Sequence, residues 1–175
     1  MVCIYYQTCN DNRYDALHSL AYRLLSEVMQ KHYGVTHYTL GKSEYGKPYF
    51  LDCPYHFSIT HTDFLVAIAV SDTPIGIDCE RADVVVRESV GKRFLQNGSA
   101  GVEDWTRYES IGKLFGSGIP YSKEQMTTPV YTKIIREIEG YVLCCASFDE
   151  NFMISRISRV IPSLEGGIPS DKMIE

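Results

Sequence analysis

The sequence has no long hydrophobic run and no excess of positive charge. Its longest wholly apolar stretch, residues 64–70, is far shorter than the roughly 20 residues that a membrane-spanning helix needs. Lysine and arginine number 17 against 22 aspartate and glutamate residues, and the net charge of −5 is spread along the chain. The first residues, MVCIYYQT, lack the basic and long apolar segments of a signal peptide. We therefore expect a cytoplasmic protein that binds neither membranes nor nucleic acid.

Several common site signatures are also missing. The six cysteines show no C-x-x-C spacing, and the adjacent Cys144 and Cys145 would point to opposite faces of a strand. The sequence therefore indicates neither a zinc site nor a disulfide framework, and we interpret the cysteines as reduced, mostly buried thiols. The chain also has no G-x-x-x-x-G-K phosphate loop and no G-x-S-x-G nucleophile motif.

The composition is that of a folded protein, with 45% hydrophobic and 22% charged residues in a chain of 175. Residues 2–8 alternate as in a strand. After them, apolar residues from Leu17 to Val28 recur at helical spacing, and Gly34 closes the segment. Residues 10–12 offer caps before this helix.

A turn and several short extended segments complete the first part of the chain. The turn lies at residues 44–48, as their glycine and proline indicate, and the extended segments are residues 49–50, 57–60 and 64–70. Thr73-Pro74 then breaks the pattern. We therefore expect an N-terminal lobe over residues 1–73.

The rest of the chain coarsely repeats this order of strand, helix and further strands. It predicts a strand at 75–80, helices at 84–94 and 105–115, a hairpin of strands at 130–138 and 141–148, and a last strand at 152–161. Asp104 is expected to cap the second helix and Gly116 to end it. We expect a C-terminal lobe over 74–161 that carries the metal-binding motifs, and a loose tail over 162–175. The expected fold class is α+β: two pseudo-symmetric α/β lobes, each a small, mainly antiparallel sheet packed with helices.

Three carboxylates and a lysine form the pattern in the sequence that most clearly indicates a functional site. Asp78 and Glu80 end an apolar strand two residues apart, so both point to one face. In the second helix, Glu109 and Lys113 lie one turn apart. Taken separately, such pairs are more often a solvated strand end and a surface ion pair. Together, the three carboxylates form an all-oxygen set suited to Mg²⁺, with Lys113 placed to contact a phosphate.

Two further residues stand out in the local pattern. His61 ends a strand beside hydroxyl residues, and a lone histidine there is more often structural, because the backbone easily satisfies either ring nitrogen. Gly112 lies in the middle of the second helix, where glycine costs about 1 kcal/mol relative to alanine. This cost predicts a close contact at Gly112.

Four short motifs follow one another along the chain. They are Gly46-Lys47-Pro48, Phe57-Ser58-Ile59-Thr60-His61-Thr62, Pro74-Ile75-Gly76-Ile77-Asp78-Cys79-Glu80, and Trp105-Thr106-x-x-Glu109-Ser110-x-x-Lys113-x-x-Gly116-x-Gly118. In this order and spacing they resemble the 4′-phosphopantetheinyl transferase superfamily, in its larger, two-lobed type that activates surfactin synthetase. The match runs from about Leu24 to Ser147. It implies transfer of the phosphopantetheine arm of coenzyme A to a serine of an apo acyl or peptidyl carrier protein, with release of adenosine 3′,5′-bisphosphate.

The resemblance also implies roles for individual residues. The implied metal ligands are Asp78, Glu80 and Glu109, with Mg²⁺ bound to the pyrophosphate. The implied catalytic residues are Glu109 and Lys113; Glu109 is either only a metal ligand or also the base that takes the serine proton. The implied coenzyme A ligands are Lys47, Thr60 and His61, with Lys47 and His61 at its phosphates.

The chain departs from the family pattern in three ways. The family usually has a lysine immediately before the helix carboxylate, where this chain has Tyr108; we expect Tyr108 to face the substrate and to weaken coenzyme A binding rather than the chemistry. The early basic residues that hold the 3′-phosphate have no clear match, and Arg13, His18 and Arg23 are the candidates. Members of this type are usually somewhat longer.

Two other functions fit the same residues. One is a non-catalytic relative that binds a carrier protein or coenzyme A, and the other is a different Mg²⁺-dependent phosphoryl transfer enzyme. The expected partners remain coenzyme A and an apo carrier protein. Because strand, helix and hairpin occur twice, one chain can supply both walls of a site, and we expect a monomer.

Overall fold

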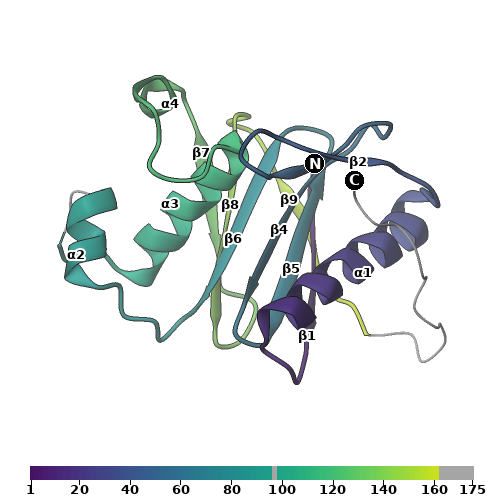
Figure 1. Cartoon of the computed structure of the whole chain (residues 1–175), viewed down its shortest axis with the longest axis horizontal. Helices are drawn as coiled ribbons and strands as arrows, with labels where there is room; N and C mark the ends of the chain where they lie inside the picture. Colours follow the sequence, from purple (N-terminus) through teal and green to yellow (C-terminus); the bar gives the residue numbers. More distant parts are fainter. Residues whose placement is uncertain (96–97, 162–175) are drawn as a thin grey trace.

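Two β-sheets of four and three strands, each covered by a helix, and a two-stranded hairpin make up the fold in the computed structural model, which describes residues 1–95 and 98–161. Figure 1 shows the two sheets side by side, with helix α1 (Tyr14–Tyr33) over one and α3 (Val102–Phe115) over the other. The expected α+β class with small, mainly antiparallel sheets packed with helices is confirmed. The tail expected at 162–175 lies outside the described residues. Over the described part of the chain, each helix is too short or too polar to cross a bilayer.

The first sheet has the strand order β4-β5-β1-β9. Its strands are β1 (Val2–Thr8), β4 (His56–Thr62), β5 (Leu65–Ser71) and β9 (Ile154–Arg159). β5 pairs antiparallel with both β1 and β4, whereas β9 runs parallel to β1. The last described strand therefore returns to the sheet that the first residues of the chain begin.

Helix α1 covers this sheet through its apolar side. Leu17, Leu24 and Val28 are buried against the strands, as their spacing predicts. The helix ends at Gly34, whose φ of 68° is the left-handed conformation of a helix terminus. The caps expected at residues 10–12 are wrong, because Arg13 is the N-cap; Asp11 instead accepts hydrogen bonds from the backbone and guanidinium of Arg13 in the turn before the helix.

The second sheet, of order β6-β8-β7, is wholly antiparallel. Its strands are β6 (Ile75–Arg81), β7 (Tyr131–Ile135) and β8 (Tyr141–Ser147), so the predicted hairpin is confirmed. Helix α3 begins at Val102, earlier than expected, with Gly101 as N-cap; Asp104 lies inside the first turn and accepts the Gly101 N–H at 2.9 Å. α3 ends at Gly116 as predicted.

Shorter elements connect the sheets. They are the hairpin strands β2 (Leu40–Lys42) and β3 (Pro48–Phe50), the helical turn α2 (Glu88–Val90) with a following π-helical turn (Gly91–Leu95), and α4 (Lys123–Thr127). The helix expected at 84–94 is thus shorter than predicted, since residues 84–87 are not helical. The turn expected at 44–48 is confirmed and joins β2 to β3, with Gly46 at a φ of 84°.

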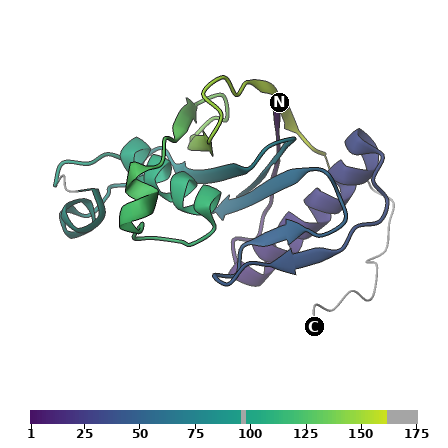
Figure 2. The ribbon, with the colours of Figure 1, turned by 90° about the horizontal axis from the view of Figure 1, so that it is seen from above.

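A shared hydrophobic core joins the two sheets. Ile4 of β1, Leu65 of β5, Ile77 of β6 and Leu143 of β8 are fully buried in one cluster. Alternate residues of the same strands face the other way, as with Tyr5, which packs under α1. Both helices therefore cover the sheet faces opposite the shared core, as Figure 2 shows from above. This leaves the even-numbered residues of β6 facing α3.

Helix α3 approaches β6 so closely that one position accepts only glycine. A Cβ atom at Gly76 would lie 2.1 Å from the backbone oxygen of Ser110 and 2.5 Å from the backbone nitrogen of Leu114. The close contact expected at Gly112 is also confirmed, because a Cβ atom there would lie 2.9 Å from a methyl carbon of Ile119. These two contacts fix the position of α3 between β6 and the segment that follows the helix.

We expect Gly76→Ala to lower the free energy of unfolding by about 1–3 kcal/mol, because the added methyl group forces the backbone of α3 away from β6. Gly98→Ala is the matched control. Its Cβ atom would meet the exposed side chain of Lys92 at 3.1 Å, which can move aside. Denaturant unfolding of both variants measures the difference, and equal losses of stability would contradict the close packing at Gly76.

Candidate metal centre

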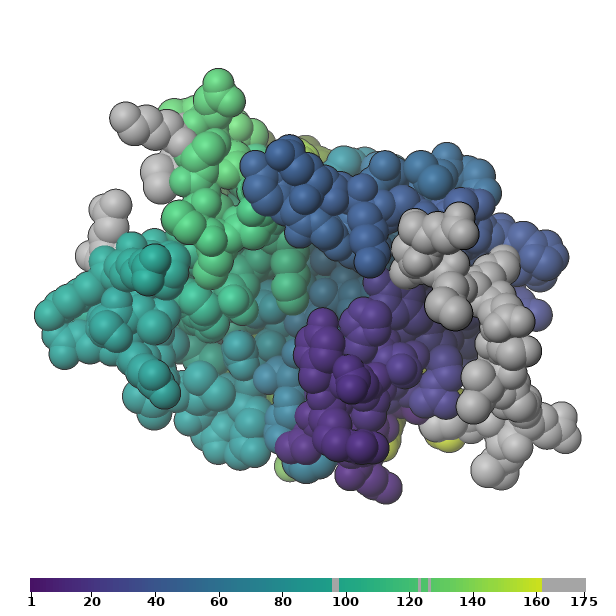
Figure 3. All heavy atoms as spheres, in the orientation of Figure 1, coloured from purple at the N-terminus to yellow at the C-terminus, as the bar shows by residue number. Residues whose placement is uncertain are grey.

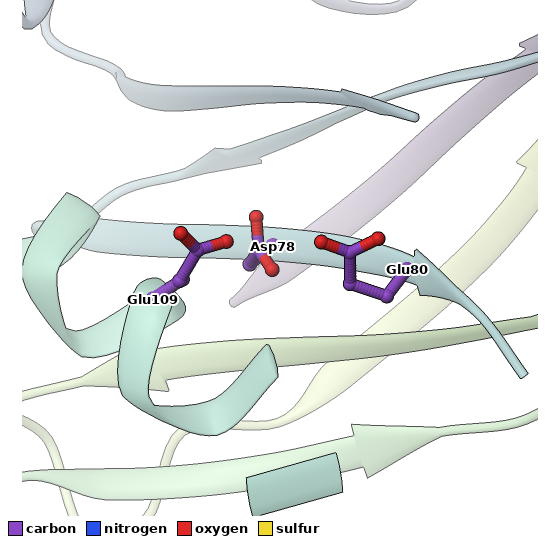
Figure 4. Close-up of side chains that lie close together, drawn as sticks. All are labelled: Asp78, Glu80 and Glu109. Atoms are coloured by element: carbon purple, nitrogen blue, oxygen red, sulfur yellow. The ribbon is translucent and has the colours of Figure 1, made fainter. Parts of the chain in front are cut away.

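Three carboxylates meet where β6 and α3 pack together. β6 presents Asp78 and Glu80 on the same face, and α3 brings Glu109 to them. One carboxylate oxygen from each residue lies within 4.8 Å of the other two. Figure 4 shows the three side chains pointing toward one another. The structure thus brings together the three carboxylates that the sequence singled out.

Asp78 is the buried centre of this group, with 3% exposure. Its Oδ1 atom accepts hydrogen bonds from Lys113 Nζ at 2.7 Å and from Thr60 Oγ1 at 3.2 Å. Its Oδ2 atom is buried and has no hydrogen-bond partner among the described residues. A buried carboxylate oxygen without a partner is costly unless a cation satisfies it. The three residues therefore fit a divalent metal ion bound through oxygen atoms.

The electrostatics of the group show the same need for positive charge. Burial, reinforced by the charge of Asp78, raises the pKa of Glu109 to about 7. Burial and the charge of Asp78 also raise the pKa of Glu80, although the hydrogen bond from Thr62 opposes the shift. Lys113 is the nearby cation: burial disfavours its charge, but Asp78 outweighs this effect and raises its pKa. One lysine thus faces three acidic groups.

Strand β4 forms a second wall beside the carboxylates. His61 is half-buried, and burial together with the charge of Lys113 lowers its pKa. Its ring meets Tyr14 edge-on at 5.5 Å, and Tyr14 stacks on His18 of α1. The exposed His18 therefore lies near His61. Arg13, by contrast, pairs with Asp11.

A cavity of about 330 Å³ adjoins the carboxylates. Its walls include Lys47 from the β2–β3 turn, Glu109 and Lys113 from α3, and Gly118 beyond the helix. Figure 3 shows the dark-blue segment of the β2–β3 turn lying against the green segment that follows α3. Lys47 holds these parts together, because its Nζ donates to the backbone oxygens of Ile75 at 3.2 Å and Leu114 at 3.3 Å. Burial lowers the pKa of Lys47 to about 8.

The expectation that Tyr108 faces the substrate is wrong. Its side chain is 9% exposed and lies in an aromatic cluster, with its ring centroid 4.2 Å from that of Tyr121 and 6.2 Å from that of Trp105. Successive residues of a helix point about 100° apart, so the turn that aims Glu109 at the metal site directs Tyr108 away from it. A lysine at this position would place a charge in the aromatic cluster.

Two residues beside the carboxylates were not expected from the sequence. Thr62 Oγ1 donates to Glu80 Oε2 at 3.2 Å, and the Trp105 side chain lies near enough to Glu80 to lower its pKa. One signal was available for Thr62, because Ser58, Thr60 and Thr62 repeat at the period of a strand and so share a face. Trp105 stands four residues before Glu109, and this helical spacing indicates only that the two residues share a face.

We expect the stability of the metal-free protein to fall as the pH rises from 4.5 to about 7. The pKa of Glu109 is about 7 in the folded chain against an ordinary 4.5, so the folded state binds more protons than the unfolded state in this range. The stabilisation from protonated Glu109 is complete below pH 4.5 and is lost as the pH passes 7. Melting temperatures measured against pH in a chelator should show this fall.

Glu109→Gln is the control, because glutamine keeps the size of the side chain and cannot titrate. The difference in melting temperature between the wild type and this variant should change with pH over the same range. Addition of Mg²⁺ at pH 7.5 should stabilise the wild type more than the variant. Parallel pH profiles for the two proteins would show that Glu109 does not carry the raised pKa.

Comparison with known proteins supports the motif pattern. No protein-family model matches the chain. The chain is similar to the 4′-phosphopantetheinyl transferase gsp of Aneurinibacillus migulanus, with 33% identity over an alignment of 135 residues that covers 61% of this chain and 56% of the relative. The chain thus spans little more than half the length of this curated relative. The similarity confirms the predicted resemblance of this chain to the 4′-phosphopantetheinyl transferase superfamily.

Proposed function

We propose that the protein transfers the 4′-phosphopantetheine arm of coenzyme A to a serine of an apo acyl or peptidyl carrier protein, in a Mg²⁺-dependent reaction. The observation that carries the proposal is the group of three carboxylates around the unpartnered Oδ2 atom of Asp78. The group lies beside a cavity, in a chain similar to a phosphopantetheinyl transferase. A pyrophosphate substrate is polyanionic, and a site for it needs bound cations.

Asp78, Glu80 and Glu109 would hold the metal ion. Bound there, Mg²⁺ would neutralise charge on the pyrophosphate of coenzyme A. Lys113 adds a positive charge on the same face, and 35% of its side chain remains exposed, so it is open to a phosphate oxygen as well as paired with Asp78. Its ion pair with Asp78 keeps the ammonium group in one place before the substrate arrives.

Glu109 is our candidate for the general base. It lines the cavity beside the other carboxylates, where it can take the proton of a bound serine hydroxyl. The carrier serine oxygen forms a bond to the β-phosphorus of coenzyme A, and the bond between that phosphorus and the bridging oxygen breaks. Adenosine 3′,5′-bisphosphate leaves, and the serine proton passes to Glu109.

Lys47 and His61 are the proposed contacts for the phosphates of coenzyme A. Lys47 lies in the wall of the cavity that Glu109 and Lys113 also line, and His61 of β4 lies near enough to Lys113 and Asp78 for their charges to act on it. The cavity extends between the β2–β3 turn and the end of α3, and we propose that coenzyme A enters there. We also propose that the chain acts as a monomer, with its site between lobes divided near Thr73-Pro74.

Asp78→Asn should lower transfer by about a hundredfold or more, because it removes the central charge of the metal site while keeping the shape of the side chain. Mass spectrometry of an apo carrier protein incubated with the wild type, coenzyme A and Mg²⁺ should show the gain of one phosphopantetheine. Asp83→Asn is the control, since Asp83 is an exposed carboxylate paired with Arg81. Binding without mass gain would instead favour a non-catalytic relative, and cleavage of coenzyme A without carrier a different phosphoryl transfer.

His61→Ala should raise the KM for coenzyme A about tenfold while changing kcat little. A hydrogen bond to a charged group is worth about 1.5–3 kcal/mol, and its loss from both substrate and transition state appears in KM. His37→Ala is the control, because His37 is exposed and lies in the segment between α1 and β2. Dephospho-coenzyme A shows which phosphate is contacted: if the variant keeps the wild-type preference for coenzyme A, His61 does not bind the 3′-phosphate.

A further inference from the structure

Strands β4 and β6 lie side by side but belong to different sheets. β4 is the edge strand of the first sheet and β6 the edge strand of the second. In Figure 1 the two strands run next to each other at the centre of the molecule. Side chains from β4 bridge them where a backbone ladder is missing: Ser58 Oγ accepts the Ile77 N–H, and Thr60 Oγ1 accepts the Cys79 N–H, both at 3.1 Å.

These hydroxyl groups bind the backbone of β6 along its free edge, which is the edge that does not pair with β8. Successive N–H groups of a strand point to opposite edges, so those of Ile77 and Cys79 leave the edge of β6 opposite β8. Both residues are buried, and their N–H groups need acceptors there. Ser58 and Thr60, 4% and 3% exposed, provide these acceptors.

The threonines of β4 also reach the carboxylates. While accepting the Cys79 N–H, Thr60 Oγ1 donates to Asp78 Oδ1 at 3.2 Å. Cys79 Sγ lies 3.4 Å from the same hydroxyl oxygen. The hydroxyl has one proton to donate, and the Asp78 carboxylate is a stronger acceptor for it than the sulfur atom. Thr62, one step further along the same face, donates to Glu80 Oε2 at 3.2 Å.

We propose that Thr60 and Thr62 are positioning residues that hold Asp78 and Glu80 at the spacing required by the metal ion. This inference rests on the proposed metal site. It assigns the Thr60 hydroxyl to β6 rather than to coenzyme A, because a phosphate can only accept a hydrogen bond and the single proton of this hydroxyl is donated to Asp78. The two hydroxyls bind one oxygen of each carboxylate and leave the other, such as Asp78 Oδ2, directed to the metal.

A physical constraint makes such positioning necessary. Asp78 and Glu80 carry like charges on one face of a strand, and without a cation they repel. A hydrogen bond to each carboxylate opposes this repulsion and limits the rotation of the side chain. Groups that orient metal ligands in this way typically change metal affinity about 10–100-fold when they are removed. The same hydroxyls tie β4, which carries His61, to the strand that carries the metal ligands.

The test compares Thr60→Val, Thr60→Ser and Thr62→Val in the full chain. Valine keeps the size of threonine and lacks the hydroxyl, whereas serine keeps it. Thr106→Val is the matched control: Thr106 is equally buried, but its hydroxyl donates to the Val102 oxygen within α3 and does not contact β6. Titration with Mn²⁺ alone measures metal affinity, and melting temperature measures stability separately.

We expect Mn²⁺ to bind about tenfold more weakly to Thr60→Val and Thr62→Val than to the wild type. Thr60→Ser should restore the affinity, and Thr106→Val should keep it whatever its melting temperature. If Thr60→Val does not fold, Thr60→Ser and Thr62→Val decide the outcome. Wild-type affinity in Thr62→Val, or a loss in Thr60→Ser as great as in Thr60→Val, would overturn the proposal.

Amide hydrogen exchange in the metal-free protein gives a readout independent of activity. In Thr60→Val the Cys79 amide should exchange faster relative to the amides of β8, because its acceptor has been removed, and in Thr60→Ser it should exchange as in the wild type. An unchanged Cys79 amide in Thr60→Val would overturn the bridge between the strands. A wild type that binds no Mn²⁺ would overturn the proposed metal site itself, whereas a wild type that binds Mn²⁺ as tightly as both valine variants contradicts only the positioning.

Discussion

The surplus of negative charge around Asp78 is the constraint on which the site depends. Three acidic side chains meet there, and Lys113 is the cation paired with the buried one. Burial makes each negative charge more costly, as the pKa of about 7 for Glu109 shows. A folded chain tolerates such a group either by protonating it or by binding a cation. A bound cation would also satisfy the unpartnered oxygen of Asp78.

The packing around β6 keeps these charges together despite their repulsion. On one face, Gly76 lets α3 approach until backbone meets backbone, which brings Glu109 within reach of Asp78. On the other face, Ile77 is fixed in the core shared by the two sheets. Along the free edge, hydroxyl groups of β4 hold the backbone and both carboxylates. β6 is therefore restrained on three sides, and the positions of its two acidic side chains follow.

The same packing explains how a site and a cavity arise between segments that are distant in sequence. Lys47 donates to backbone oxygens of both β6 and α3, so it joins the β2–β3 turn to the elements that carry the three carboxylates. On the far side of α3, Tyr108 packs against Tyr121 and Trp105. One face of α3 thus carries Glu109 toward the carboxylates, and another face carries Tyr108 into the aromatic cluster, although the two residues are adjacent in sequence.

Local patterns in the sequence determined most elements of the fold and the composition of the carboxylate group. Strand alternation placed Asp78 and Glu80 on one face, and helical spacing joined Glu109 to Lys113, because these relations depend only on the periods of the backbone. The return of β9 to β1, the bridge from Thr60 to Cys79 and the burial of Tyr108 were decided by the tertiary structure. Each joins elements whose relative placement depends on packing over long distances, which no local period encodes. The single charge on Lys113 could be counted from the sequence, but its partner was fixed only when α3 packed on β6.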